Sequence, residues 1–139
     1  MPPPPDLPPS STVPRALHVL LVDDEELLVQ LNTELLSAEG FRVSGFTDPQ
    51  AALAAVCQEP LAFDVVITDL TMPGMTGLEL ATALRRVRSN LPIILVSGYG
   101  ADVTLQRAER LGISRIIDKP ASAAELARCI RAVVRRLDT

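Results

Sequence analysis

Groups that could bind a metal ion or a phosphate stand at the ends of four short apolar runs in this sequence. Two carboxylates follow the first run, a carboxylate and a hydroxyl end two middle runs, and an amine follows the last. These residues are Asp23 and Asp24, Asp69, Ser97 and Lys119. They recur at corresponding places in separate segments, so a random scatter of surface polar residues is a poor explanation.

If the three aspartates meet in one site, they bring three negative charges against the single positive charge of Lys119. Two like charges ~5 Å apart repel by roughly 3 kcal/mol at an effective dielectric of about 20. Such a site must hold a proton or a cation. Oxygen donors without His or Cys favour Mg²⁺, with Mn²⁺ as the alternative. With a dication bound, a phosphoryl donor could approach, and an aspartate can accept the phosphoryl group as an acyl phosphate.

Five apolar, β-rich runs alternate with helical patterns along the chain. The runs predict buried strands over His18–Val22, Arg42–Phe46, 64–68, 92–96 and Arg115–Asp118. Between and after them, helices are predicted over 27–38, 49–58, 78–88, 102–111 and from Ala123 onward. Five βα units predict an α/β fold, a doubly wound parallel sheet with helices on both faces. Ligands bind outside the carboxyl ends of such strands, which is where the polar residues lie.

Leucines and cap residues give further detail on the helices. One predicted helical stripe, expected to face the core, contains Leu27, Leu28, Leu31, Leu35 and Ala38. Gly40 fits a C-terminal cap of that helix, and Asp48 before Pro49 fits the N-cap of the next one. The apolar stripe of the last helix contains Leu126, Ile130, Val133 and Leu137.

Length and composition limit the possible functions. The 139 residues, 47% of them hydrophobic, suffice for one compact core, and the net charge of −4 disfavours binding to nucleic acid or to an anionic membrane. No apolar run reaches the ~20 residues of a membrane span, and no signal peptide is apparent, so we expect a cytoplasmic protein. Residues 1–15 contain seven of the twelve prolines and predict a disordered tail or linker before a domain over 16–139.

Taken together, these motifs resemble the receiver domain of two-component response regulators, as found in chemotaxis regulators. The resemblance covers about residues 17–137 and depends on these motifs in order: the acidic pair after the first strand, Asp69 followed by Met72-Pro73-Gly74 and Gly77, Ser97-Gly98, and Lys119-Pro120. It implies a flavodoxin-like sheet of strand order 2-1-3-4-5. It also implies a phosphorelay switch that receives a phosphoryl group from a histidine kinase or a histidine phosphotransfer protein. Such a domain is no enzyme beyond promoting its own phosphorylation and dephosphorylation.

The same resemblance assigns a role to each site residue. Asp69 matches the phosphoacceptor, Asp24 the direct metal ligand, and Asp23 its partner, which acts through a water molecule. The backbone carbonyl of Thr71 matches the remaining protein ligand of the Mg²⁺. Ser97 and Lys119 match the hydroxyl and the cation that contact the phosphoryl oxygens. The peptide bond between Lys119 and Pro120 is expected to be cis.

Two departures from the usual pattern concern how the signal leaves the site. Ile116 stands where most receivers have an aromatic residue on the fifth strand, and Ala121 stands where many have one after Lys-Pro. We therefore expect Ile116 to stay packed in both states, since it is short and stiff at χ1. Tyr99 is then the aromatic side chain available as a substitute lever. The Ser97-Gly98-Tyr99 loop is similar to receivers attached to hybrid histidine kinases.

Other functions fit the sequence less well. A nucleotide-binding enzyme of this fold class needs a glycine-rich first loop, but the loop after Val22 is acidic and would repel phosphates. A haloacid-dehalogenase-like phosphatase needs Asp-x-Asp, and Thr71 stands at the second position. A receiver used only as an inert docking module would not need all the phosphorylation groups. His18 begins a buried strand and is expected to have a packing role.

Overall fold

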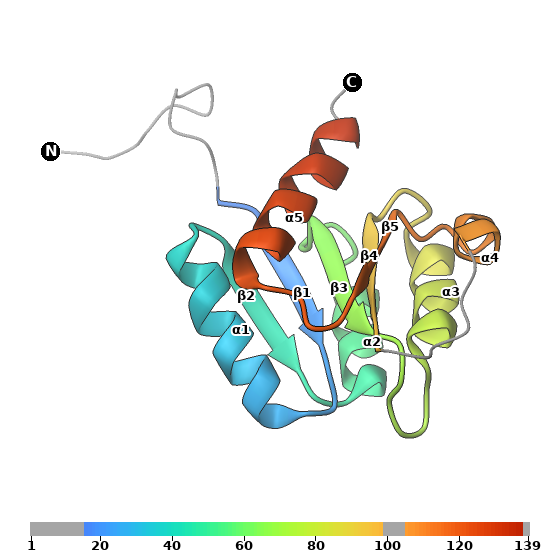
Figure 1. Ribbon diagram of the computed structural model, residues 1–139. Helices are drawn as coiled ribbons and strands as arrows, with labels where there is room; N and C mark the ends of the chain where they lie inside the picture. The colour runs from blue at the N-terminus through green and yellow to red at the C-terminus, as the bar shows by residue number, and fades with distance from the viewer. Residues whose placement is uncertain (1–15, 99–104, 138–139) are drawn as a thin grey trace, which may run out of the picture.

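The computed structural model describes residues 16–98 and 105–137, so Tyr99 lies outside the described residues. Within them, one parallel sheet contains β1 His18–Val22, β2 Arg42–Phe46, β3 Val65–Asp69, β4 Ile93–Ser97 and β5 Arg115–Asp118 (Figure 1). The strand order is β2-β1-β3-β4-β5, which confirms the predicted doubly wound sheet. The third and fourth strands begin and end one residue later than predicted, and the other three match.

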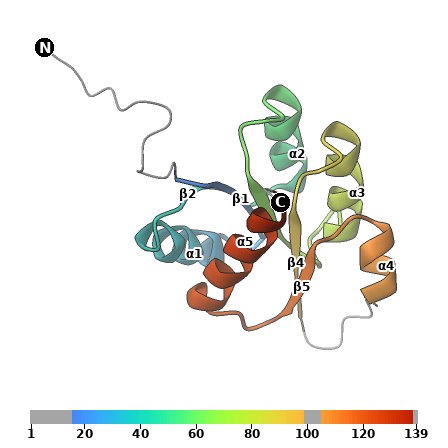
Figure 2. The same ribbon diagram turned by 90° about the horizontal axis from the view of Figure 1, so that it is seen from above.

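Helices cover both faces of the sheet. They are α1 Glu26–Ala38, α2 Pro49–Gln58, α3 Gly77–Val87, α4 Leu105–Arg110 and α5 Ala123–Leu137. Figure 2 shows α1 and α5 on one face and α2, α3 and α4 on the other. Alternate side chains of each strand point to opposite faces. Leu20 and Val66 therefore pack in the core under α2, α3 and α4, whereas Leu21 and Ile67 pack under α1 and α5.

Helix ends follow the predicted cap chemistry. The Asp48 carboxylate accepts a hydrogen bond from the Gln50 N–H at 3.0 Å, with Pro49 as the first residue of α2. Gly40 follows α1 with a φ of 102°, the left-handed region that favours glycine at a helix end. The described part of α4 begins at Leu105, inside the predicted range of 102–111. Among the described residues, no helix is long and apolar enough to cross a membrane.

The outer face of α1 differs from the prediction. Val29 and Leu36 are the buried residues of this helix. Of the five residues in the predicted core-facing stripe, only Leu28 is half-buried. The other four are exposed: Leu27, Leu31, Leu35 and Ala38. The prediction that this stripe faces the core is therefore wrong.

The cause lies on the neighbouring edge strand. Gly45 of β2 carries no side chain, and a Cβ there would lie only 2.5 Å from Val29 Cγ1 and 3.2 Å from Thr33 Oγ1. The helix therefore packs closely on β2 through the face centred on these two residues. Helical residues are about 100° apart around the axis, which places Leu27 and Leu31 on nearly the opposite side from Val29.

Candidate functional site

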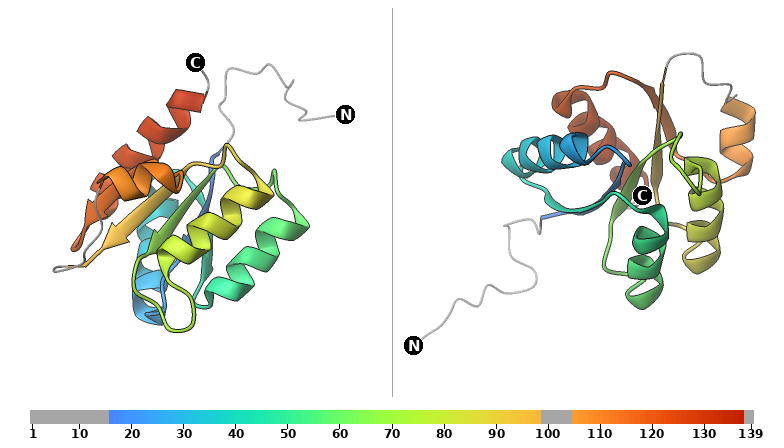
Figure 3. Two further views of the ribbon diagram at one scale, coloured as in Figure 1. Left: turned by 90° about the vertical axis from the view of Figure 1, so that its right-hand side faces the viewer. Right: turned by 90° about the horizontal axis from the view of Figure 1, so that it is seen from below.

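The carboxyl ends of β1 and β3 lie side by side in the middle of the sheet. The strand order reverses between these two strands, the point at which doubly wound sheets bind ligands. The right panel of Figure 3 views this edge, where the chain turns from β1 into α1 and from β3 towards α3. Asp23 and Asp24 directly follow β1, and Asp69 is the last residue of β3.

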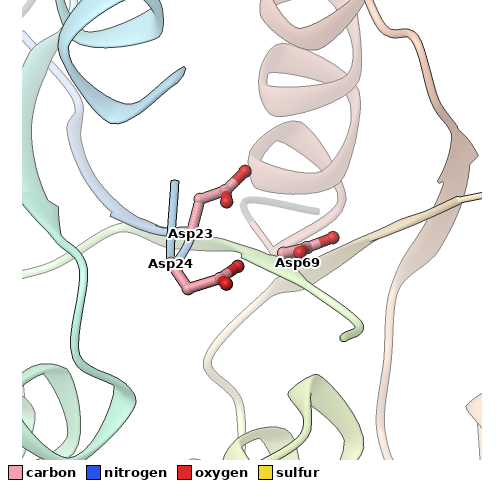
Figure 4. Close-up of side chains that lie close together, drawn as sticks. All are labelled: Asp23, Asp24 and Asp69. Carbon is pink, nitrogen blue, oxygen red and sulfur yellow. The ribbon is translucent and has the colours of Figure 1, made fainter. Parts of the chain in front are cut away.

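Three carboxylates converge at this edge, as Figure 4 shows. One ligand oxygen from each of Asp23, Asp24 and Asp69 can be chosen so that all lie within 4.8 Å of one another. Asp69 and Asp23 are only 5% and 8% exposed, whereas Asp24 is exposed. The cluster therefore combines two buried acids with one that is open to solvent.

The amine of Lys119 reaches the cluster from the segment after β5. Its Nζ lies 3.0 Å from Asp69 Oδ1 and 3.8 Å from Asp23 Oδ2. The backbone N–H of Lys119 donates to the Ser97 carbonyl at 2.9 Å, and the Lys119–Pro120 peptide bond is cis. Lys119 is also the only lysine among the 13 basic residues of the chain, the rest being arginines.

Burial and neighbouring charges shift two of these groups. Burial raises the pKa of the Asp23 carboxyl, and the negative charges of Asp69 and Asp24 add to this, while the Glu25 N–H and Lys119 oppose it. Burial acts to lower the pKa of Lys119, but the hydrogen bond and charge of Asp69, with the charge of Asp23, outweigh burial and raise it. The Asp23 shift is chiefly an effect of burial, whereas the Lys119 shift reflects the negative charge around its amine.

Backbone contacts hold the acids in position. The Asp23 carboxylate accepts a hydrogen bond from the Glu25 N–H at 2.9 Å, which fixes its orientation just before α1. Directly after Asp69, the Leu70 N–H donates to the Val96 carbonyl at 2.9 Å, so the sheet ladder continues past the acid. Asp69 is therefore held by the hydrogen-bonded sheet, and Asp23 by the turn that leads into α1.

The start of α3 packs directly against the backbone of the central acid. The Gly77 N–H donates to the Leu70 carbonyl at 2.8 Å, and a Cβ at Gly77 would collide with the Asp69 carbonyl oxygen. Just before it, Thr76 and Glu79 form a reciprocal capping box. The Thr-x-x-Glu spacing of these residues is a sequence signal for this helix start.

The remaining predicted site residues lie around this cluster. Ser97 ends β4 and is 5% exposed, with its hydroxyl 3.4 Å from the Gly98 carbonyl. Thr71 is exposed, two residues after Asp69. Ile116 of β5 is half-buried, pairs in register with Leu95, and packs against the core under α2, α3 and α4. The functional roles of these residues stay predictions.

The donor set of the cluster fits a hard divalent cation. Asp23, Asp24 and Asp69 offer oxygen atoms alone, the ligand type that Mg²⁺ and Mn²⁺ share. One positive charge from Lys119 does not balance three carboxylates, and the exposed Asp24 gives an ion access from solvent. A dication would favour the charged form of Asp23, whose pKa is raised chiefly by burial and further by the charges of Asp69 and Asp24.

A family model described as the response regulator receiver domain matches residues 19–131, which include the acids, Ser97 and Lys119. The chain belongs to the response regulator receiver family. It is thus a receiver domain of two-component signalling, as the sequence motifs predicted. This family assignment replaces the two enzyme hypotheses considered from the sequence, a nucleotide-binding enzyme and a haloacid-dehalogenase-like phosphatase.

Individual relatives agree with this assignment. The sensory transduction protein RegX3 of Mycobacterium tuberculosis is 40% identical over 118 residues, 85% of this chain and 51% of that protein. The transcriptional regulatory protein FixJ of Bradyrhizobium diazoefficiens is 31% identical over 121 residues, 87% of this chain and 58% of that protein. The receiver therefore spans about half the length of these curated relatives.

A solved structure supports the fold. The response regulator receiver domain protein of Clostridium thermocellum matches with a TM-score of 0.83 at 24% identity, over 88% of this chain and 97% of that one. At this identity the likeness concerns the fold alone.

Proposed function

We propose that this receiver accepts a phosphoryl group on Asp69 in a Mg²⁺-dependent reaction and then signals to a partner protein by changing conformation. The domain occupies residues 16–139, behind a proline-rich segment over 1–15. The observation that carries the proposal is the convergence of three carboxylates within 4.8 Å, with the Lys119 amine 3.0 Å from Asp69. Mn²⁺ is the alternative ion.

The two acids after β1 would divide the work of holding the ion. Asp24 is exposed and would bind the ion directly. Asp23 already accepts the Glu25 N–H and lies 3.8 Å from Lys119, so it would act through a water molecule. Asp69 and the Thr71 carbonyl would complete the protein ligands. The ion would supply positive charge that orients the phosphoryl oxygens and offsets their charge.

Phosphoryl transfer then depends mainly on positioning and charge. A carboxylate oxygen of Asp69 attacks the phosphorus of a phosphohistidine, an O–P bond forms, and the N–P bond breaks with its electron pair returning to the imidazole. Lys119 leaves its contact with Asp69 and pairs with a phosphoryl oxygen. Ser97 moves inward and donates its hydroxyl hydrogen to another. Hydrolysis of the acyl phosphate, in which water attacks the phosphorus, inorganic phosphate is released and the Asp69 carboxylate is restored, would use the same groups, and no other enzymatic activity is proposed.

The proposed phosphodonor is a histidine kinase or a histidine phosphotransfer protein, and we propose that the domain acts in the cytoplasm. Direct contact of this domain with nucleic acid or membrane is not proposed, in keeping with its net charge of −4. Attachment to a hybrid histidine kinase stays a prediction from the Ser97-Gly98-Tyr99 loop.

Signal output would not use an aromatic switch on β5. Ile116 is half-buried against the core and stiff at χ1, so it stays packed in both states. Beryllofluoride is expected to shift the amide resonances after Asp69 and around Ser97 more than those of Ile116 and the outer face of α5. Large shifts centred on Ile116 would reject this part of the proposal.

Incubation with acetyl phosphate tests the metal requirement directly. Intact-mass analysis should find one phosphoryl adduct with Mg²⁺ and none with a chelator. Asp24→Asn should weaken Mg²⁺ binding more than Asp23→Asn, and Glu34→Gln, an exposed acid outside the cluster, should leave it unchanged. At a Mg²⁺ concentration of about ten times Kd, the ion should stabilise the protein by about 1.4 kcal/mol. An adduct that forms equally without divalent ions would contradict the proposal.

A further inference from the structure

Charge is divided unevenly between the two halves of this chain. Residues 16–84 contain eleven acidic residues and one basic residue, Arg42. Residues 85–137 contain eleven of the 13 basic residues and four acidic ones. This second set forms the end of α3 and β4, α4, β5 and α5, so positive charge gathers towards the β5 edge of the sheet although the net charge is −4. Such a surface attracts partners that carry negative charge.

Part of this basic side is hollowed between α3 and α4, which lie side by side in Figures 1 and 2. Two adjoining hollows of about 310 and 410 Å³ share Arg85 and Glu109 among their lining residues. We call the two hollows together the arginine groove. Its charged lining residues are Arg85, Arg86, Arg110 and Glu109, three bases and one acid.

The three arginines of the groove are held differently. Arg85 is half-buried, and its Nη1 donates to the Leu91 carbonyl at 3.2 Å. Its guanidinium packs so closely on Gly112 that a Cβ at that glycine would collide with it. Arg86 and Arg110 are exposed, and their side chains form no ion pair or hydrogen bond with any described residue. One fixed guanidinium therefore lies in the middle of the groove, with one unpaired guanidinium on each helix.

We propose that the arginine groove binds an acidic segment of a partner protein, whose carboxylates pair with Arg86 of α3 and Arg110 of α4. Guanidinium groups suit carboxylates because two parallel N–H donors can face the two oxygens. The groove follows α3 from Thr82 to Val87, a rise of about 8 Å, and continues to Pro92. At ~3.3 Å per residue, roughly four to six residues of an extended segment fit along it.

A protein segment suits the groove better than a compact polyanion or a nucleic acid. Glu109 lines both hollows and forms no ion pair within the described part of the chain, so it would repel phosphates placed beside Arg85. An extended peptide can place its carboxylates on either side of Glu109, whereas a nucleic acid carries charge at every step. Leu111 and Ile113 also line the groove and offer contacts for apolar side chains of such a segment.

A second copy of this chain offers acids in a less suitable form. The exposed acids Glu26 and Glu34 lie on α1, and Glu39 after it already pairs with Arg131 at 3.6 Å. None of these three stands on an extended segment that could lie between two helices. The proposal therefore takes the segment from another protein, and self-association through the groove would contradict it.

Amide chemical-shift titration of the full chain tests this binding with a defined probe. The probe is the acetylated and amidated peptide Glu-Leu-Glu-Glu-Leu-Glu, and its neutral counterpart has Gln in place of every Glu. At low ionic strength, the acidic peptide should shift the resonances of Thr82, Arg86 and Gly112, and the neutral peptide should not. The paired change Arg86→Glu and Arg110→Glu should weaken binding of the acidic peptide roughly tenfold.

A matched control changes the same amount of charge elsewhere on the basic side. Arg128→Glu with Arg135→Glu alters two exposed arginines of α5 that do not line the groove, and should weaken binding less than about twofold. A peptide with Lys in place of every Glu should bind the groove variant and not the parent chain. This exchange of charges shows a direct contact and does so in a variant that must be folded to bind.

Equal weakening in the two paired variants would reduce the effect to general attraction by the basic side and would overturn the proposal. Equal binding of the neutral peptide, or no shift in the groove at millimolar acidic peptide, would also overturn it. Groove shifts that grow with protein concentration alone would assign the surface to a second copy, and tighter binding of a single-stranded DNA oligonucleotide would assign it to nucleic acid. Either outcome rejects an acidic protein segment. None of these measurements uses Mg²⁺ or phosphorylation, so their failure is distinct from failure of the proposed function.

Discussion

The two ends of β1 carry polar clusters of different character. At the amino end, His18 Nδ1 lies 2.9 Å from the Ala62 carbonyl and Nε2 lies 2.7 Å from the Ser44 hydroxyl. Its backbone N–H donates to Asp64 at 2.8 Å, and its ring lies against Phe63 with centroids 4.5 Å apart. Each ring nitrogen of the histidine thus has a neighbour at hydrogen-bond distance.

At the carboxyl end, the groups do not balance one another. Asp23 and Asp69 share Lys119, while Asp24 adds a third carboxylate to the same cluster. Polar groups that satisfy each other hold a structure together, whereas a partly buried surplus of charge requires a ligand. The comparison therefore separates a structural cluster from a functional one on the same strand.

Removal of the amine should give the largest effect on function. Lys119→Met takes away the cation that pairs with the transferred phosphoryl group, and we expect phosphorylation by acetyl phosphate to slow roughly 100-fold. The matched control is Arg131→Met. Arg131 lies on α5 and forms an ion pair with Glu39 at 3.6 Å, outside the aspartate cluster. Time-resolved intact-mass analysis gives both rates. An unchanged rate in Lys119→Met would remove the amine from the mechanism.

Removal of the histidine should affect stability alone. His18→Ala leaves the Ala62 carbonyl and the Ser44 hydroxyl without their partner, at a cost of about 1–3 kcal/mol in the free energy of unfolding. Urea denaturation with and without Mg²⁺ measures this cost and shows whether the ion still stabilises the variant as it does the parent. If Mg²⁺ no longer stabilised the variant, the two ends of β1 would be coupled. The separation into a structural and a functional cluster would then be wrong.

A smaller effect concerns pH in the absence of metal. The folded state raises the pKa of Asp23, chiefly through burial, so between its unfolded and folded pKa values the folded chain holds a proton that the unfolded chain releases. This group therefore lowers the free energy of unfolding as pH rises from acidic towards neutral values. Asp23→Asn should remove that contribution, as denaturation in EDTA across this pH range would show. An identical pH profile in the variant would contradict it.

Much of the fold and of the acidic cluster could be predicted because both depend on local patterns. Continuous apolar runs such as His18–Val22 identify buried parallel strands, and strand order brings Asp23 and Asp69 together. Spacing alone could not predict the orientation of α1. That orientation depends on Gly45 of β2. Because glycine has no side chain, Val29 can pack against the strand at this point, and Leu27 then faces solvent.

The side-chain contacts around the acids depend on the three-dimensional structure in the same way. The sequence identified Lys119, but its simultaneous approach to Asp69 and Asp23 requires the position of β5 beside β4. Likewise, Gly77 is explained by the close approach of α3 to the Asp69 carbonyl. Residue types predict which groups are present, and packing decides which of them meet.

Chemical trapping of the acyl phosphate tests the central claim most directly. After incubation with Mg²⁺ and acetyl phosphate, borohydride reduces an aspartyl phosphate to homoserine, and tandem mass spectrometry of the digested chain locates that residue. The account predicts homoserine at position 69 in the parent chain and none in Asp69→Asn. Homoserine at Asp23 or Asp24 instead, or an adduct that persists undiminished in Asp69→Asn, would contradict it.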